Sequence, residues 1–193
     1  MAEKKYKWRR DDYRENTKGL LMLNTGDGKG KTTAAIGVMV RAAGRELNCC
    51  MIQFMKSKTD RYGEHESFEK LGIEVHTMGD GFTWDTNDKT QDIKTSEETW
   101  ALCVEKMKTT EYDLLVFDEL LYVLSYGFLD IDSVIAEIKA IREEQPHLHL
   151  ILTGRNVDGA IDNLIEAADL VTEMKEVKHP FYAGIFAQQG IEF

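Results

Sequence analysis

The residues with the clearest chemical potential form the stretch GDGKGKTT, which follows the apolar run GLLMLN in this 193-residue chain. Glycines let a backbone turn tightly and approach phosphate oxygens without a Cβ in the way. The first turn of a helix offers unpaired N–H groups and a partial positive charge to an anion. The stretch therefore predicts a phosphate-binding loop that opens a helix, made of Gly26, Asp27, Gly28, Lys29, Gly30, Lys31, Thr32 and Thr33.

Two kinds of side chain near this loop suit a nucleotide and its metal ion. Lys31 supplies a point charge to phosphate oxygens, and Thr32 supplies a hydroxyl for Mg²⁺. Asp118 and Glu119 end a second apolar run, LLVF, and their carboxylates could hold the same ion directly or through water. Mn²⁺ accepts the same oxygen ligands. We expect a cation site of these three oxygen donors, with the choice between the two carboxylates as direct ligand left open.

The loop departs in one place from the Walker pattern G-x-x-x-x-G-K-[ST]. Aligned on the GKT of residues 30–32, that pattern requires a glycine at position 25, where this chain has Thr25. The loop is thus one residue shorter and could hold a triphosphate differently from a hydrolase. Asp27 also places a carboxylate next to an anion, which requires that it turn outward or meet the metal.

Two further cations follow predicted strands. Arg155 comes after LHLILTG, and its guanidinium fork could bind phosphate oxygens or a planar amide group of a ligand. Lys56 comes after MIQFM and could make the same contacts. A surface ion pair is the alternative for each of them. We expect Arg155 to contact the nucleotide.

Apolar runs alternate with helical patterns along the chain. The predicted strands cover residues 20–24, 49–55, 73–76, 113–117, 149–153 and 170–173, and the predicted helices cover 31–43, 64–71, 90–108, 131–144 and 158–168. Runs such as LLVF and LHLILT do not alternate, which is typical of a parallel sheet with helices on both faces. The sequence therefore predicts a single-domain α/β fold of the P-loop NTPase type over residues 19–193. Its ligand crevice should lie beyond the carboxyl ends of the strands.

Composition restricts the classes of partner. The net charge is −10, and a protein that binds nucleic acid usually carries a basic footprint instead. No apolar run is long enough to span a membrane, and the first residues lack the apolar core of a secretory signal. Three cysteines without metal-binding spacing are typical of free thiols in a reducing compartment. We expect a cytoplasmic protein that binds neither nucleic acid nor membrane.

Residues 1–18 break the acidic trend, with seven Lys/Arg against four Asp/Glu. This basic arm could be solvated. Alternatively, its aromatic residues Tyr6, Trp8 and Tyr13 could dock on the fold or on a partner subunit.

A second unusual stretch, MGDGFTWDTND at residues 78–88, places Phe82 and Trp84 between glycines and polar residues. The two rings could anchor the loop as a hydrophobic plug. The same alternation could equally present two apolar faces to a flat ligand.

Six segments of the chain, in order, resemble the ATP:corrinoid adenosyltransferases that have a P-loop and a recombinase-like fold. They are NTGDGKGKTTAA, QFMK, MGDGFTW, VFDEL, LTGRN and KHPFYAGIFAQQGIEF. The likeness runs from about residue 19 to residue 193, and GFTW and the C-terminal segment are far more specific than a phosphate loop. The chain departs from the family at Ser57, where glycine is usual, and in the charged stretch KTDRYGE that follows.

The resemblance implies transfer of the 5′-deoxyadenosyl group of ATP to the cobalt(I) of a corrinoid, with triphosphate leaving. It makes Lys31, Phe82 and Trp84 the catalytic residues, because non-coordinating rings at the lower face of the corrinoid make cobalt(II) easier to reduce. It also assigns Lys56 to a corrinoid contact and Glu119 to the metal directly. The implied partners are cobalamin, cobinamide or cobyrinic acid a,c-diamide, a reduced flavoprotein as electron donor, and a second copy of the chain in a homodimer.

Two other functions remain open on the residues alone. A P-loop ATPase or small-molecule kinase would use the same loop, and Glu119 could polarise water, although the shortened loop and the lack of an acceptor motif argue against it. A non-enzymatic corrinoid carrier would bind ATP only as an effector. The phosphate product separates these functions, since only adenosyl transfer releases intact triphosphate.

Overall fold

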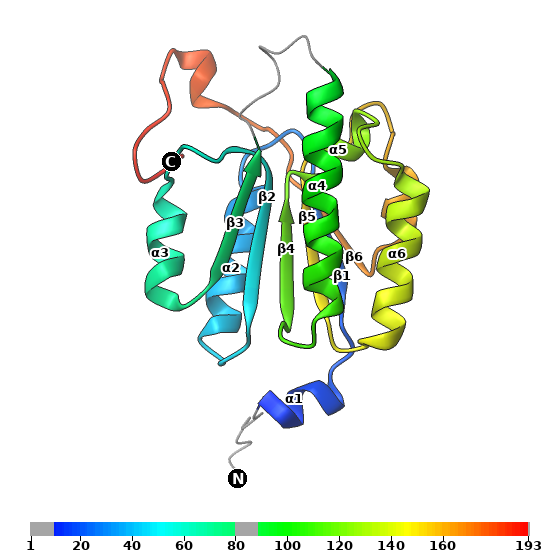
Figure 1. The fold of residues 1–193 in the computed structure, drawn as a ribbon. Helices are drawn as coiled ribbons and strands as arrows, with labels where there is room; N and C mark the ends of the chain where they lie inside the picture. The colour runs from blue at the N-terminus through cyan, green and yellow to red at the C-terminus, as the bar shows by residue number, and fades with distance from the viewer. Residues whose placement is uncertain (1–9, 80–88, 193) are drawn as a thin grey trace.

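One sheet of six parallel strands organises the residues that the computed structural model describes, 10–79 and 89–192 (Figure 1). The strands are β1 Leu21–Thr25, β2 Cys49–Ser57, β3 Glu74–Gly79, β4 Leu114–Asp118, β5 His149–Thr153 and β6 Leu170–Glu173. Their order across the sheet is β3-β2-β4-β5-β1-β6, and every neighbouring pair is parallel. All carboxyl ends of the strands therefore lie at one edge, as the sequence predicts.

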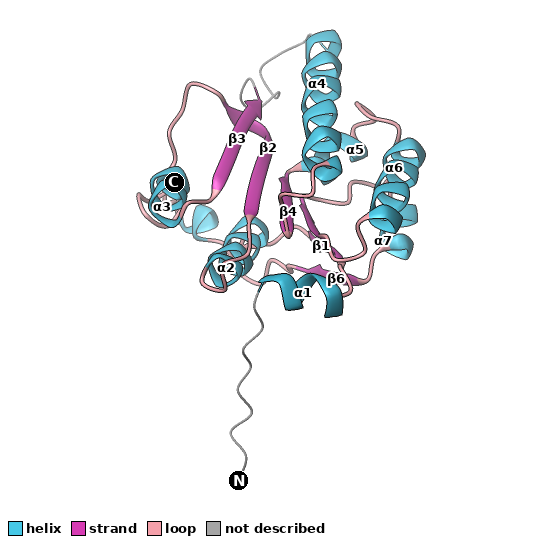
Figure 2. Cartoon of the chain, turned by 60° about the horizontal axis from the view of Figure 1, so that its bottom comes forward, coloured by secondary structure: helices cyan, strands magenta, loops and turns pink. Residues whose placement is uncertain are grey.

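Helices cover both faces of this sheet, as Figure 2 shows. They are α1 Arg10–Asn16, α2 Lys31–Ala43, α3 Gly63–Leu71, α4 Lys89–Lys108, α5 Leu120–Ser125, α6 Ile131–Glu144 and α7 Asp162–Ala167, with a 3₁₀ turn η2 at Pro180–Ala183. On one face, Met39 of α2 and Phe68 of α3 pack against the sheet. On the other face, Met107 of α4 and Ile138 of α6 do the same. The α/β prediction with helices on both faces is confirmed.

The central strand β4 shows the burial that is typical of a parallel sheet with helices on both faces. Every residue of β4 is buried, because helices lie on both of its faces. Such a strand needs an uninterrupted apolar run, and LLVF provides one. The polar residue that ends the run, Asp118, is thereby carried to the edge of the sheet while still buried.

The described part of the basic arm contacts the fold. Arg14 in α1 pairs with Asp113 at 2.7 Å, and the ring of Tyr13 lies 6.1 Å from the ring of His149. For these two residues the docking alternative describes the structure better than a solvated arm. No helix among the described residues combines the length and the apolar character that crossing a bilayer would require.

Candidate nucleotide-binding site

The phosphate loop connects β1 to α2, and two of its glycines adopt backbone angles that other residues avoid. Gly26 has φ 96° and Gly30 has φ 111°, in the left-handed region. Gly28 is required for a different reason, which is the close approach of the segment after β6. The Gly28 N–H donates to the carbonyl oxygen of Met174 at 2.6 Å. A Cβ on Gly28 would lie 2.8 Å from that oxygen. The glycines thus shape the loop against the segment that follows β6, in addition to leaving room for phosphate.

Lys31 is the first residue of α2, and its side chain turns back into the loop. Its ammonium donates to the carbonyl oxygens of Gly26 at 2.7 Å and Gly28 at 2.9 Å. Burial lowers the pKa of this ammonium, and the neighbouring Arg155 adds to the effect, while Glu119 and Asp27 oppose it. The charge therefore sits at the centre of the loop, where an anion would bind.

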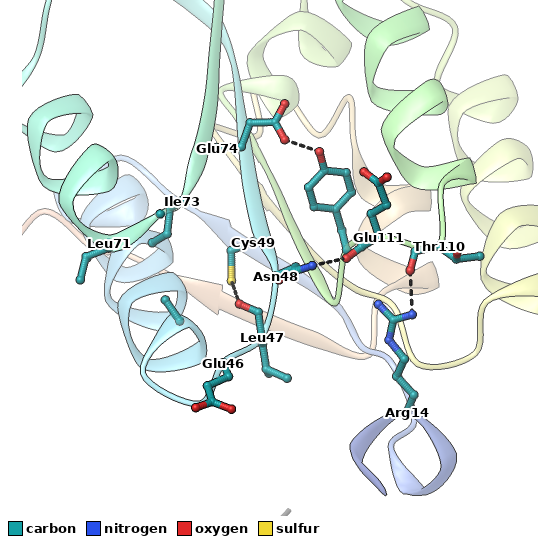
Figure 3. Close-up of a pocket in the computed structure, with 13 residues that line it drawn as sticks. Arg14, Glu46, Leu47, Asn48, Cys49, Leu71, Ile73, Glu74, Thr110 and Glu111 are labelled. Carbon is teal, nitrogen blue, oxygen red and sulfur yellow. Dashed lines mark hydrogen bonds between the residues drawn. The ribbon is translucent and has the colours of Figure 1, made fainter. Parts of the chain in front are cut away.

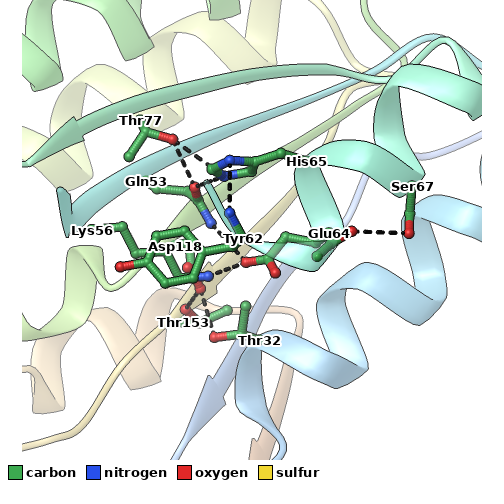
Figure 4. A network of polar contacts seen from close by, with 11 residues as sticks. Thr32, Gln53, Lys56, Tyr62, Glu64, His65, Ser67, Thr77, Asp118 and Thr153 are labelled. Atoms are coloured by element: carbon green, nitrogen blue, oxygen red, sulfur yellow. Dashed lines mark hydrogen bonds and ion pairs between the residues drawn. The ribbon is translucent and has the colours of Figure 1, made fainter. Parts of the chain in front are cut away.

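Thr32, the next residue, connects the loop to the acidic strand end. Its hydroxyl donates to Asp118 Oδ1 at 2.7 Å (Figure 4). The hydroxyl of Thr153, at the end of β5, donates to the same oxygen at 2.7 Å and accepts from the N–H of Glu119 at 2.9 Å. The structure thus brings together the residues that the sequence predicts as a cation site, and it adds Thr153.

Two carboxylate oxygens in this cluster have no hydrogen-bond partner among the described residues. They are Asp118 Oδ2 and Glu119 Oε2, and both are buried. Burial and the adjacent Asp118 raise the pKa of Glu119 to about 7, although Lys31, Arg155 and Lys56 oppose the rise. Because buried polar atoms nearly always have partners, the two oxygens indicate a site that a cation would complete.

A cavity of about 600 Å³ opens beside this cluster. The phosphate loop and the start of α2 form one wall, and the start of α3 forms another. Lys56, Glu119 and residues 190–192 of the C-terminal segment complete the lining. The cavity lies beyond the carboxyl ends of the strands, where parallel α/β sheets bind their ligands.

The cations Lys29 and Lys56, which line the cavity, and Arg155, which does not, each have a partner within the chain. Lys29 pairs with Glu192 at 2.7 Å, and Lys56 pairs with Glu64. Arg155 lies 3.7 Å from Asp27, whose side chain is 83% exposed, so this acid has turned outward as its position requires. Binding of an anionic ligand at these cations would therefore exchange internal partners for phosphate oxygens.

A larger hollow of about 890 Å³ lies at the opposite edge of the sheet (Figure 3). Two of its polar side chains already make hydrogen bonds to the backbone. Arg14 donates to the carbonyl of Thr110 at 2.7 Å, and Asn48 donates to the carbonyl of Glu111 at 2.8 Å. Among the described residues, none that the sequence singles out for chemistry lines it. The smaller cavity is therefore the candidate nucleotide site.

Comparison with known proteins identifies the family of this chain. A family model described as ATP:corrinoid adenosyltransferase BtuR/CobO/CobP matches residues 17–193. The chain belongs to this family.

Relatives in the corrinoid adenosyltransferase family align along most of the chain. The protein of that name from Sinorhizobium sp. is 42% identical over 180 residues, which are 91% of this chain and 81% of the relative. Another, from Escherichia coli K12, is 34% identical over 204 residues and covers both chains fully. Among solved structures, the flagellar accessory protein FlaH from Methanocaldococcus jannaschii superposes with a TM-score of 0.55 at 12% identity, over 86% of this chain and 76% of that one. At such low identity this likeness shows the fold alone.

Two residues that the family resemblance makes central, Phe82 and Trp84, lie outside the described residues. Their assignment to the corrinoid stays a prediction.

Four residues of this candidate site were not predicted individually from the sequence: Thr153, Gln53, Glu64 and Glu192. Thr153 and Gln53 are fully buried polar residues in apolar strands, and that contrast is a signal in the sequence. For Glu64 and Glu192 the sequence contains no comparable signal, because each meets its lysine only through the fold.

Proposed function

We propose that the protein transfers the 5′-deoxyadenosyl group of ATP to the cobalt(I) ion of a corrinoid and releases triphosphate. The observation that carries the proposal is the cluster of Lys31, Thr32, Asp118 and Glu119 at the nucleotide cavity, in a chain of the corrinoid adenosyltransferase family. Such a cluster suits a reaction in which negative charge develops on a leaving phosphate chain.

The reaction is a displacement at the ribose C5′. Cobalt(I) of the substrate donates an electron pair to C5′ and forms the cobalt–carbon bond, the C5′–O bond breaks, and the electron pair of the broken bond leaves with the triphosphate. No proton has to be removed, so the chain needs no general base. Lys31 and the N–H groups at the start of α2 stabilise the departing oxygens, and the cavity walls orient ATP for in-line attack.

Mg²⁺ fits the oxygen donors that the site presents. Asp118 and Glu119 would hold it together with Thr32, since one oxygen of each carboxylate lacks a partner among the described residues. When bound, the ion would supply additional positive charge to the phosphate oxygens. Mn²⁺ could take the same place. Glu119 is our choice for the direct ligand.

The remaining assignments are part of the same proposal. Phe82 and Trp84 would cover the lower face of the corrinoid and favour reduction of cobalt(II) by a reduced flavoprotein. Cobalamin, cobinamide and cobyrinic acid a,c-diamide are the candidate substrates. Three buried free cysteines support a reducing, cytoplasmic setting. The edge strand β6, with Leu170 50% exposed, supports a homodimer.

An anaerobic assay with Mg-ATP and chemically reduced cobalamin tests the reaction. We expect light-sensitive adenosylcobalamin to appear in step with intact triphosphate. A Lys31→Met variant, which keeps the stem and removes the charge, should lose about a hundredfold or more in rate. An unchanged spectrum with several corrinoids would refute the proposal. Release of phosphate or ADP in that case would indicate a hydrolase or kinase, and tight corrinoid binding without ATP consumption would indicate a carrier.

A further inference from the structure

Arg155 and the two cavity-lining cations Lys29 and Lys56 differ in what holds their acidic partners. Asp27, opposite Arg155, is exposed, and Glu192, opposite Lys29, belongs to the last residues of the chain. Glu64, opposite Lys56, is different. Its side chain is only 14% exposed, and a network of hydrogen bonds from β2, β3 and α3 holds it in place (Figure 4).

That network begins with Gln53, a fully buried residue of β2. The Gln53 amide oxygen accepts from the hydroxyl of Thr77 at 3.0 Å and lies 2.8 Å from His65 Nε2. Two donors on one side require the oxygen there, so the amide NH₂ points the other way. It donates to Glu64 Oε1 at 3.4 Å, the same oxygen that binds the Lys56 ammonium.

His65 adopts one tautomer in this arrangement. Its Nδ1 accepts from the backbone N–H of Tyr62 at 3.4 Å, which leaves the proton on Nε2, toward Gln53. The ring of Tyr62 also lies 4.4 Å from the Lys56 ammonium and confines it from the other side. Strands β2 and β3 and helix α3 thus combine to hold one positive charge in one place.

Lys56 and Glu64 line the same cavity as Lys31, Thr32 and Glu119. The charge that this network holds therefore faces the nucleotide site. We propose that Lys56 binds the triphosphate of ATP and that Glu64, fixed by Gln53, is a positioning residue that aims the Lys56 ammonium. The inference rests on the proposed function, and it moves Lys56 from the corrinoid to the nucleotide.

The sign of one substitution tests this positioning role. Glu64→Gln keeps the size of the side chain and removes its charge. If Glu64 only repelled the triphosphate, this change would tighten Mg-ATP binding. If Glu64 aims Lys56, the change should weaken Mg-ATP binding about tenfold, because a charge-assisted bond that orients the ammonium is lost. Isothermal titration calorimetry with Mg-ATP, without corrinoid, measures the affinity.

A double-mutant cycle separates positioning from a general structural effect. In a Lys56→Met background, Glu64→Gln should no longer weaken Mg-ATP binding, because the group that it aims is gone. An equal weakening in both backgrounds would overturn the proposal, as would tighter or unchanged binding in the Lys56 background. Glu64→Asp, which keeps the charge but withdraws it from Lys56, repeats the test if Glu64→Gln does not fold.

The matched control is Glu69→Gln on the same helix. Glu69 pairs with Arg61 at 2.8 Å, and both side chains are exposed, away from the cavity. We expect this variant to bind Mg-ATP like the wild type. Failure of adenosyl transfer with normal Mg-ATP binding would count against the proposed function alone. Absence of Mg-ATP binding in the wild type would remove the basis of both.

Discussion

At the scale of single residues, Thr153 is the hydroxyl that holds the acidic strand end in place. It donates to Asp118 Oδ1 and accepts from the N–H of Glu119, and it is fully buried. Thr153→Val keeps the shape and removes both bonds, which leaves the Glu119 N–H without its acceptor. We expect the free energy of unfolding to fall by about 1–3 kcal/mol, measured by urea denaturation. Mg-ATP affinity should fall as well, because Asp118 loses one of its two anchors.

Thr153→Ser is the matched control for this prediction. It keeps the hydroxyl and removes only a methyl group, so most of the stability and the Mg-ATP affinity should be retained. If Thr153→Val behaved like Thr153→Ser in both measurements, the hydroxyl would not be what holds Asp118 and Glu119.

The convergence of Lys31, Thr32 and Asp118 could be predicted from the sequence, because each follows a strand and parallel strands share one carboxyl edge. Their roles in binding stay predictions. The reason for the glycine at position 28 could be found only in the structure. It is the contact with the carbonyl oxygen of Met174, which lies far along the chain. Contacts of this kind leave no pattern in the local sequence.

At the scale of elements, one ionic cluster connects β3 to α4 and to the start of β4. Glu74 accepts hydrogen bonds from Lys106 at 2.8 Å, from His76 at 2.6 Å and from the hydroxyl of Tyr112. Cys50 lies close enough to form a metal-like triad with Glu74 and His76. The Lys106 ammonium already pairs with the Glu74 carboxylate, so we interpret the cluster as structural.

The pKa of Glu74 provides a test of that interpretation. Partial burial would raise it, but the hydrogen bonds from Lys106, Tyr112 and His76 outweigh burial and lower the pKa to about 2. A carboxyl with a lowered folded-state pKa stabilises the fold above its ordinary value of 4.5, and the contribution is lost as the pH falls toward 2. The wild type should therefore exceed Glu74→Gln in unfolding free energy at pH 6. Roughly half of that excess should disappear by pH 3.

Urea denaturation at a series of pH values measures this difference. Glu105→Gln, at an exposed position next to Lys106 on α4, is the control and should show no such pH dependence relative to the wild type. A difference between the wild type and Glu74→Gln that stayed constant from pH 6 to pH 3 would show that the cluster does not depend on the charge of Glu74.

The elements that the sequence predicts well are those with a full period or an uninterrupted apolar run. The bounds of α2, α6, β5 and β6 agree with the structure. Helix α5 has only six residues, too few to show a helical period, and it was missed. Helix α7 begins at Asp162 rather than at Asp158, because Asp158 and Gly159 have positive φ angles and the Asn156 side chain accepts from the N–H of Ile161.

At the scale of the whole molecule, the C-terminal segment returns from β6 to the phosphate loop and ends beside α3 (Figure 1). The sequence predicts neither this return nor the strand order, because both depend on contacts between residues far apart in the chain. Phe186 and Ile191 of the segment are 85% and 77% exposed, so little apolar burial holds it against the fold. Its Glu192 nevertheless reaches Lys29 of the loop.

Glu192 therefore pairs with a cation, Lys29, that could otherwise bind the triphosphate. Replacing this glutamate by glutamine should have the opposite effect on Mg-ATP affinity from Glu64→Gln. The Glu192 N–H donates to the carbonyl of Gln188, within its own turn, whereas Glu64 is anchored by Gln53. Glu192→Gln removes a competing anion, so Mg-ATP should bind about 1.4- to 5-fold more tightly, which corresponds to the ~0.2–1 kcal/mol of an ion pair at the protein surface. Calorimetry at low and high salt measures the gain in affinity, which should shrink as salt screens the ion pair.

The control is Glu166→Gln, on the exposed side of α7, which removes an equal charge elsewhere and should leave the Mg-ATP affinity unchanged. Weaker binding by Glu192→Gln would mean that the segment assists ATP binding through this carboxylate rather than competing with it.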